Sequence, residues 1–168
     1  GTALSLAEHT LTLTGGGTLS NTNSLTMGNA SSVLKVTGPN TVSGPIALIA
    51  GTLDIDEDSA ISGAIVQGGS ASIDVAPGKT LTYSGAAISL GANTLTIAGG
   101  GSISSTNALV LENADSQLAI TGNGVLSGAQ VTTALTTGIV ISESSTITAL
   151  TIRDLTPVAI AADKLLSG

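Results

Sequence analysis

The sequence predicts an all-β protein, specifically a right-handed parallel β-helix with three short strands per coil. Three observations predict it. The chain of 168 residues repeats itself when residue 10 is laid on residue 94, and such self-similarity is typical of solenoids. Hydrophobic and polar residues alternate in short stretches that Gly, Asn, Ser or Pro separate, as in half-buried strands. No window of ten residues places apolar side chains at helical spacing without a Gly or a β-branched run, so no helix is expected.

The repeat divides a single solenoid domain, residues 1–168, into two tandem copies of about residues 1–85 and 86–168. Residues 10–20 (TLTLTGGGTLS) match residues 94–104 (TLTIAGGGSIS) without a gap. Each copy contains four segments of 19–23 residues, which gives about eight coils. The turn after the second strand of each coil is three residues long, so the coils are expected to stack in register. The prediction places these residues in one inward column: Leu11, Leu34, Leu53, Ile73, Leu95 and Leu118.

The composition excludes several classes of protein. Charged residues make up only 9% of the chain and the net charge is −7, so no basic surface is available for nucleic acid. The absence of cysteine excludes disulfides and thiolate metal sites. No apolar run approaches the ~20 residues that span a bilayer, so this segment is not expected to insert into a membrane. No cofactor is expected.

The densest acidic cluster is a candidate metal site. Asp54, Asp56 and Asp58 lie close together in the sequence and could hold Ca²⁺ through carboxylate oxygens. The alternative is a solvated acidic corner, which the second copy supports because it does not preserve these charges. Asp54 and Asp56 would also lie ~7 Å apart, within the range for an inverting glycosidase. However, no basic or aromatic residues accompany them to form a sugar-binding cleft.

A row of hydroxyl side chains is the candidate ligand-binding face. One Ser or Thr follows the third strand of every coil, at the same predicted outward place: Ser20, Ser43, Ser62, Ser84, Ser104, Ser127, Thr148 and Ser167. A flat hydroxyl face could order water, as in ice-binding solenoids. The alternative is turn chemistry, because Gly follows five of these residues and Ser-Gly favours corners.

Two further features are interpreted as structural. His9 is the single histidine, and it is predicted to lie in a surface corner without metal-binding partners. The runs at residues 15–17 and 99–101 are three glycines each, but neither a helix nor a Lys-Ser or Lys-Thr pair follows them. They are predicted to form turns rather than phosphate-binding loops.

Residues 33–44 (VLKVTGPNTVSG) together with residues 51–55 (GTLDI) resemble the passenger-associated strand repeat of bacterial autotransporters. They are also similar to repeats of filamentous-haemagglutinin-type adhesins, and residues 118–128 (LAITGNGVLSG) keep the pattern in the second copy. This resemblance implies a right-handed β-helix that projects from the bacterial surface, where adhesion or spacing is the usual role and catalysis the exception.

We therefore expect a non-enzymatic structural segment of an extracellular bacterial surface fibre or adhesin. The alternatives are a ligand-, calcium- or ice-binding solenoid and, less favoured, a carbohydrate-active enzyme. The expected partners are copies of the chain itself or adjacent repeats, joined head to tail, and a host or neighbouring-cell surface. Neither end of the sequence resembles a polar capping repeat, and this is the reason for expecting head-to-tail continuation.

Overall fold

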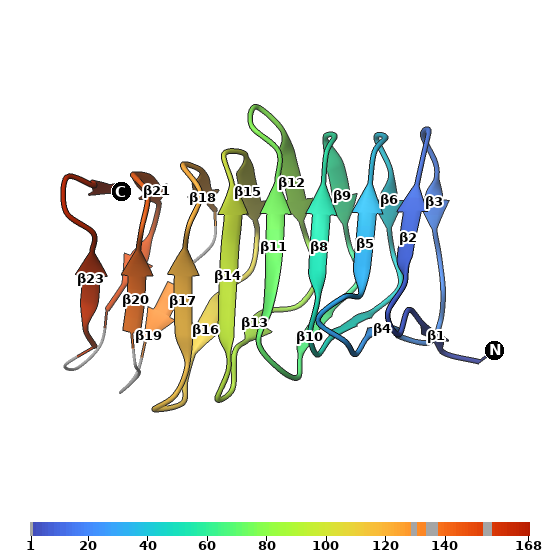
Figure 1. The fold of residues 1–168 in the computed structure, drawn as a ribbon, viewed down its shortest axis with the longest axis horizontal. Helices are drawn as coiled ribbons and strands as arrows, with labels where there is room; N and C mark the ends of the chain where they lie inside the picture. Colours follow the sequence, from blue (N-terminus) through green and yellow to red (C-terminus); the bar gives the residue numbers. More distant parts are fainter. Residues whose placement is uncertain (1, 129–130, 134–137, 153–155) are drawn as a thin grey trace.

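The computed structural model describes residues 2–128, 131–133, 138–152 and 156–168, and it confirms the predicted β-solenoid. The regular elements in these ranges are all strands, and all strand pairs are parallel (Figure 1). In Figure 1 the chain rises along the near face, returns along the far face and advances from N to C in the right-handed sense. These ranges contain no helix long and apolar enough to cross a membrane.

Each coil contributes three strands, and strands at equivalent positions stack into sheets. The first strands form two separate sheets, here called sheet A and sheet D. Sheet A contains β1 (Leu4–Ser5), β4 (Leu25–Met27), β7 (Ile46–Leu48) and β10 (Ile65–Gln67). Sheet D contains β13 (Ile88–Ser89), β16 (Leu109–Leu111), β19 (Val131–Thr133) and β22 (Leu150–Thr151). The division between them falls where the first sequence copy ends and the second begins.

The second and third strands of the coils form two continuous eight-stranded sheets, B and C. Sheet B contains β2 (Thr10–Leu13), β5 (Val33–Val36), β8 (Thr52–Ile55), β11 (Ala71–Val75), β14 (Thr94–Gly99), β17 (Gln117–Ile120), β20 (Gly138–Ile141) and β23 (Val158–Ile160). Sheet C contains β3 (Thr18–Leu19), β6 (Thr41–Val42), β9 (Ser59–Ile61), β12 (Thr80–Tyr83), β15 (Ser102–Ser105), β18 (Val125–Ser127), β21 (Ser145–Ile147) and β24 (Leu166–Ser167). The two sheets therefore join all eight coils.

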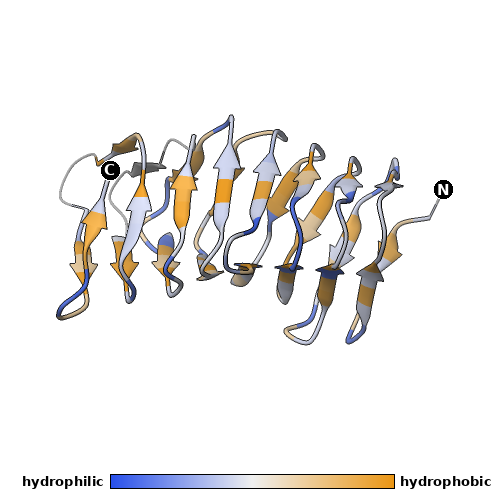
Figure 2. Cartoon of the chain, turned by 90° about the horizontal axis from the view of Figure 1, so that it is seen from above, coloured by the Kyte–Doolittle hydropathy of each residue, from blue (hydrophilic) through white to orange (hydrophobic). Residues whose placement is uncertain are grey.

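The core is a stack of aliphatic side chains inside the coils. The alternation along each strand directs hydrophobic residues inward and polar residues outward, and Figure 2 shows this as alternating colours along the strands. Leu34, Leu48 and Leu53 are fully buried, and Met27 fills the same interior. Each such side chain contributes about 1.5–3 kcal/mol by leaving water, so repetition of aliphatic residues replaces the missing aromatic ones.

The predicted inward column is straight only within each copy. Leu11, Leu34, Leu53 and Ile73 are register partners, as expected. Ile73 then pairs with Ile97 rather than Leu95, and Leu95 pairs with Ala71. The prediction of one column through Leu95 and Leu118 is therefore wrong by two residues at the step between the copies.

The fourth coil, formed by β10, β11 and β12, causes this register step. Its strands β11 and β12 are each one residue longer than their predecessors: β11 adds the buried Ala71 and β12 adds the half-exposed Thr80. Leu81 takes the inward place that Ser59 has in the preceding coil. Val75 pairs with Ile55 while Tyr83 pairs with Ile61, so the corner between sheets B and C is two residues longer in coil 4 than in coil 3. Figure 1 shows this loop rising above its neighbours.

Glycine stacking closes the corners in both copies. A Cβ on Gly38 would overlap the backbone of Gly15 in the preceding coil, and a Cβ on Gly122 would overlap the backbone of Gly99. Gly15 and Gly99 have φ values of +74° and +75°, the left-handed region that glycine adopts most easily. Glycine at these corners therefore permits both the sharp turn and the close approach of neighbouring coils.

Candidate functional site

The acidic cluster is organised around a lysine from the preceding coil. Lys35 lies on β5 and is the register partner of Asp54 on β8. Its Nζ atom lies 2.6 Å from Asp54 Oδ2 and 2.6 Å from Asp56 Oδ2. Hydrogen bonds with Asp54 and Asp56 raise the pKa of Lys35 above its ordinary value. The two carboxylates that were candidates for an acid and a base thus bind one ammonium group together.

The rest of the cluster also binds groups on the neighbouring coil. Glu57 Oε2 lies 2.6 Å from Lys79 Nζ, and Asp58 Oδ1 accepts a hydrogen bond of 2.8 Å from the Thr80 amide. Within the described ranges, no three Asp, Glu, His or Cys residues are grouped so that they could hold a metal ion. The structure therefore places Asp54 and Asp56 beside Lys35 of the preceding coil and Asp58 beside the Thr80 amide of the following coil, in an arrangement that ties successive coils together.

Asp74 belongs to the same acidic face, although the sequence did not single it out. It is the register partner of Asp54 on the next strand, β11. Burial raises the pKa of the Asp74 carboxyl, and the charges of Asp54 and Asp56 raise it further, while Lys35 lowers it. A carboxyl with a raised pKa stabilises the fold at acidic pH and loses that contribution as pH rises through its folded pKa. The Asp74 carboxylate therefore opposes folding at neutral pH, whereas the raised pKa of Lys35 means that its ion pairs with Asp54 and Asp56 favour the folded chain there.

The hydroxyl row is exposed or half-exposed, but it does not form the single column that we predicted. Register places Ser20, Ser43, Ser62 and Ser84 in line, one residue beyond the last paired residues of their strands. Ser104 pairs with Thr82 instead of Ser84, and Ser127 follows Ser104. Thr148 continues that second line, whereas Ser167 pairs with Thr146. The two-residue step at coil 4 and a second step at the last coil break the row.

The observed register builds a different hydroxyl column on sheet C. This column crosses the boundary between the copies and contains Thr18, Thr41, Ala60, Thr82, Ser104, Ser127 and Thr148. Beside it, the Thr146 and Ser167 hydroxyls lie 2.9 Å apart and hydrogen bond along the solenoid axis. The ligand-binding alternative would rest on this column, which the sequence pattern alone did not align.

His9 and the glycine runs occupy corners, as predicted. His9 is exposed, and its backbone amide donates a hydrogen bond of 2.8 Å to the Leu6 carbonyl within the turn. Residues 15–17 lie in the corner between sheets B and C. Gly99 is the last residue of β14, and residues 100–101 form the same corner in the second copy, where both runs stack against neighbouring coils.

A further set of polar groups, missed at the sequence level, lies inside the solenoid. Ser32 and Ser116 are fully buried, and their hydroxyls donate to the carbonyls of Ala7 and Gly91 in the preceding coils. The signal was present, because residues 29–32 (NASS) and residues 113–116 (NADS) occupy equivalent places in the two copies. In both copies, an Asn followed by a Ser three residues later marks a loop that hydrogen bonds to the preceding coil.

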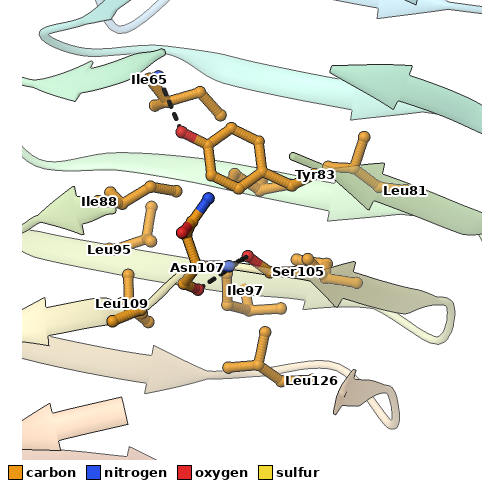
Figure 3. Close-up of a pocket in the computed structure, with 13 residues that line it drawn as sticks. Ile65, Leu81, Tyr83, Ile88, Leu95, Ile97, Ser105, Asn107, Leu109 and Leu126 are labelled. Atoms are coloured by element: carbon orange, nitrogen blue, oxygen red, sulfur yellow. Dashed lines mark hydrogen bonds between the residues drawn. The ribbon is translucent and has the colours of Figure 1, made fainter. Parts of the chain in front are cut away.

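The most unusual interior position is Tyr83, the single aromatic residue of the chain. Its ring is 2% exposed and lies at the step between coils 4 and 5, where sheet A gives way to sheet D. A cavity of about 20 Å³ lies beside it, lined mainly by aliphatic residues together with Ser105 and Asn107 (Figure 3). Ser105 is the register partner of Tyr83, so a small side chain leaves space below the ring.

Comparison with known proteins adds no functional assignment. No protein-family model matches the chain, and neither does any curated protein or solved structure.

Proposed function

We propose that this chain is a non-enzymatic structural segment of an extracellular bacterial surface fibre or adhesin. The observation that carries the proposal is the continuity of sheets B and C, in which parallel ladders join every coil to the next. Such a ladder transmits force along its length through many backbone hydrogen bonds. The resemblance of residues 33–44 and 118–128 to autotransporter and haemagglutinin-type repeats supports the surface location.

The outer faces support a structural rather than a catalytic role. The described ion pairs link one coil to the next: Lys35 with Asp54 and Asp56, Lys79 with Glu57, and Lys164 with Glu143. A glycosidase needs two carboxyl groups whose different environments separate their pKa values, one as acid and one as base or nucleophile. Asp54 and Asp56 instead share the same cation.

The outermost coils support the proposed partner, which is another coil of the same kind. The inward residues Leu11, Leu13 and Leu19 of coil 1 are only partly buried, as are Val158 and Leu166 of coil 8. Their counterparts in coils 2 to 6 are buried. Adjacent repeats or another copy of the chain, joined head to tail, would cover these side chains and pair the open strand edges.

Incubation with a broad panel of polysaccharides, with and without Ca²⁺, tests the proposal. We expect no release of reducing ends or unsaturated products, because the ionisable groups bind one another across coils. The matched control is Asp115→Asn, on another coil. If the chain cleaved a polysaccharide, and Asp54→Asn abolished that activity while Asp115→Asn left it unchanged, the enzymatic alternative would be established and the proposal contradicted.

A further inference from the structure

The first strands follow a regular hydrogen-bonding rule within each copy. In three of the described first strands, the backbone amide that opens the strand donates to the carbonyl that precedes the first strand of the next coil. The examples are Leu25 to Pro45 at 2.9 Å, Ile46 to Ala64 at 2.8 Å and Ile88 to Ala108 at 2.9 Å. By this rule, the amide of Ile65 should donate to the carbonyl of Ala87.

At the junction between coils 4 and 5, a tyrosine hydroxyl takes the place of that bond. The Ile65 amide donates to Tyr83 Oη at 3.1 Å, and Tyr83 Oη donates to the Ala86 carbonyl at 2.6 Å. Figure 3 shows the ring directed at Ile65. Strands β10 and β13, both fully described, share no ladder pairing and belong to different sheets. The hydroxyl therefore connects two coils whose main chains do not pair on this face.

Gln67 makes a second connection of the same kind. It stands in line with Leu48 and Met27, in an otherwise aliphatic column, and is only 8% exposed. Its Nε2 donates a hydrogen bond of 3.0 Å to the Thr94 carbonyl, at the start of the next coil's β14. Its Oε1 is buried and accepts no hydrogen bond from the described protein atoms. A buried acceptor left unsatisfied costs free energy, so this side of the junction is weakly held.

The other two faces of the junction are strongly held. Strands β11 and β14 share five register pairs and β12 and β15 share four, so sheets B and C cross the junction without a break. Two faces are thus joined by backbone ladders and one face by two side chains. A junction joined in this way opens on the face formed by sheets A and D, here called the weak face, and bends about the corner between sheets B and C.

We propose that the junction between coils 4 and 5 is a hinge of the solenoid, and that the Tyr83 hydroxyl is its latch. When the latch opens, β10 and β13 separate while sheets B and C stay paired. The hinge is a property of the solenoid itself and does not depend on the proposed surface role.

Amide hydrogen exchange resolved at single residues tests the latch. In the unaltered chain, the Ile65 amide should exchange faster than the equivalent amides of Leu25 and Ile46, whose acceptors are backbone carbonyls. Tyr83→Phe keeps the ring and removes the hydroxyl, so it should speed exchange at Ile65 about tenfold, the size expected for one buried hydrogen bond. The Leu25 and Ile46 amides should not change. Thr82→Val, which removes an outward hydroxyl from the same strand, is the control and should change none of the three.

Distance measurements between spin labels test the bending. The chain has no cysteine, so labels can be placed freely. The pair Thr26→Cys and Val110→Cys spans the weak face, and the pair Val33→Cys and Gln117→Cys spans sheet B over the same number of coils. Tyr83→Phe should broaden the distance distribution of the first pair and leave the second unchanged. If Tyr83→Phe accelerated exchange equally at all three amides, Tyr83 would be an ordinary core residue. If it changed neither exchange at Ile65 nor the distance distribution of the first pair, the Tyr83 hydroxyl would not hold the two coils together. Either result overturns the proposal.

Discussion

Replacing Leu34 with Asp should unfold at least the coils around it. Leu34 is fully buried, and its register partners Leu11 and Leu53 close the interior on both sides. The substitution loses about 1.5–3 kcal/mol of burial. It also places a carboxylate in a dry interior with no cation beside it, at a cost of several kcal/mol more. The sum is comparable with the whole stability of a domain, about 5–15 kcal/mol.

Circular dichroism and thermal denaturation measure this effect, and Val33→Asp is the matched control. Val33 lies next to Leu34 on β5, but it faces outward and is half-exposed. The control should retain the strand signal and lose little thermal stability. If Leu34→Asp melted like the control, the side chain could not be in a sealed core, and the inward column would be wrong.

Replacing Gly38 with Ala should destabilise the fold by about 3 kcal/mol or more, because the added methyl group would overlap the backbone of Gly15. Backbone atoms in stacked coils cannot move aside as the end of a flexible side chain can. Gly122→Ala should behave in the same way at the Gly99 corner of the second copy.

Gly16→Ala is the control for the corner. A Cβ at Gly16 would lie 3.7 Å from the Pro39 side chain, an ordinary contact, and Gly16 does not have a positive φ. Chemical denaturation of the three variants should therefore show a large loss for Gly38→Ala and Gly122→Ala and little change for Gly16→Ala. Equal midpoints for all three would contradict the close stacking of the corners.

The sequence was sufficient to predict the fold because strand periodicity and an internal repeat are local properties. It was not sufficient to predict the register between the copies. The stretch from Thr80 to Tyr83 offers two inward residues, Leu81 and Tyr83, and either one could align with the next coil. Sequence self-comparison matches coil 1 with coil 5, whereas stacking depends on how coil 5 packs on coil 4. The predictions of a single hydroxyl row and of a single inward leucine column were wrong at this step.

The contacts of the acidic cluster could not be predicted from the sequence for a similar reason, because they depend on how one coil packs on the next. Asp54, Asp56 and Asp58 are close in sequence, so they suggested a shared ligand. Their partners lie one coil away: Lys35 precedes Asp54 by 19 residues, about the length of one coil, and Thr80 follows Asp58 by 22. A coil-length spacing between opposite charges could have indicated these contacts in advance. The hydrogen bonds of Tyr83 and Gln67 had no such signal, because they depend on the missing pairing between β10 and β13.

The association state of the 168-residue chain tests most directly the claim that this solenoid serves as a repeating structural unit. Sedimentation over a wide concentration range, with electron microscopy of the same samples, should show masses that grow with concentration and rods of constant width that lengthen. Backbone amides of β2 and β23 should become protected from exchange as the rods form. A strictly monomeric chain at high concentration, with those edge strands already protected, would contradict the account.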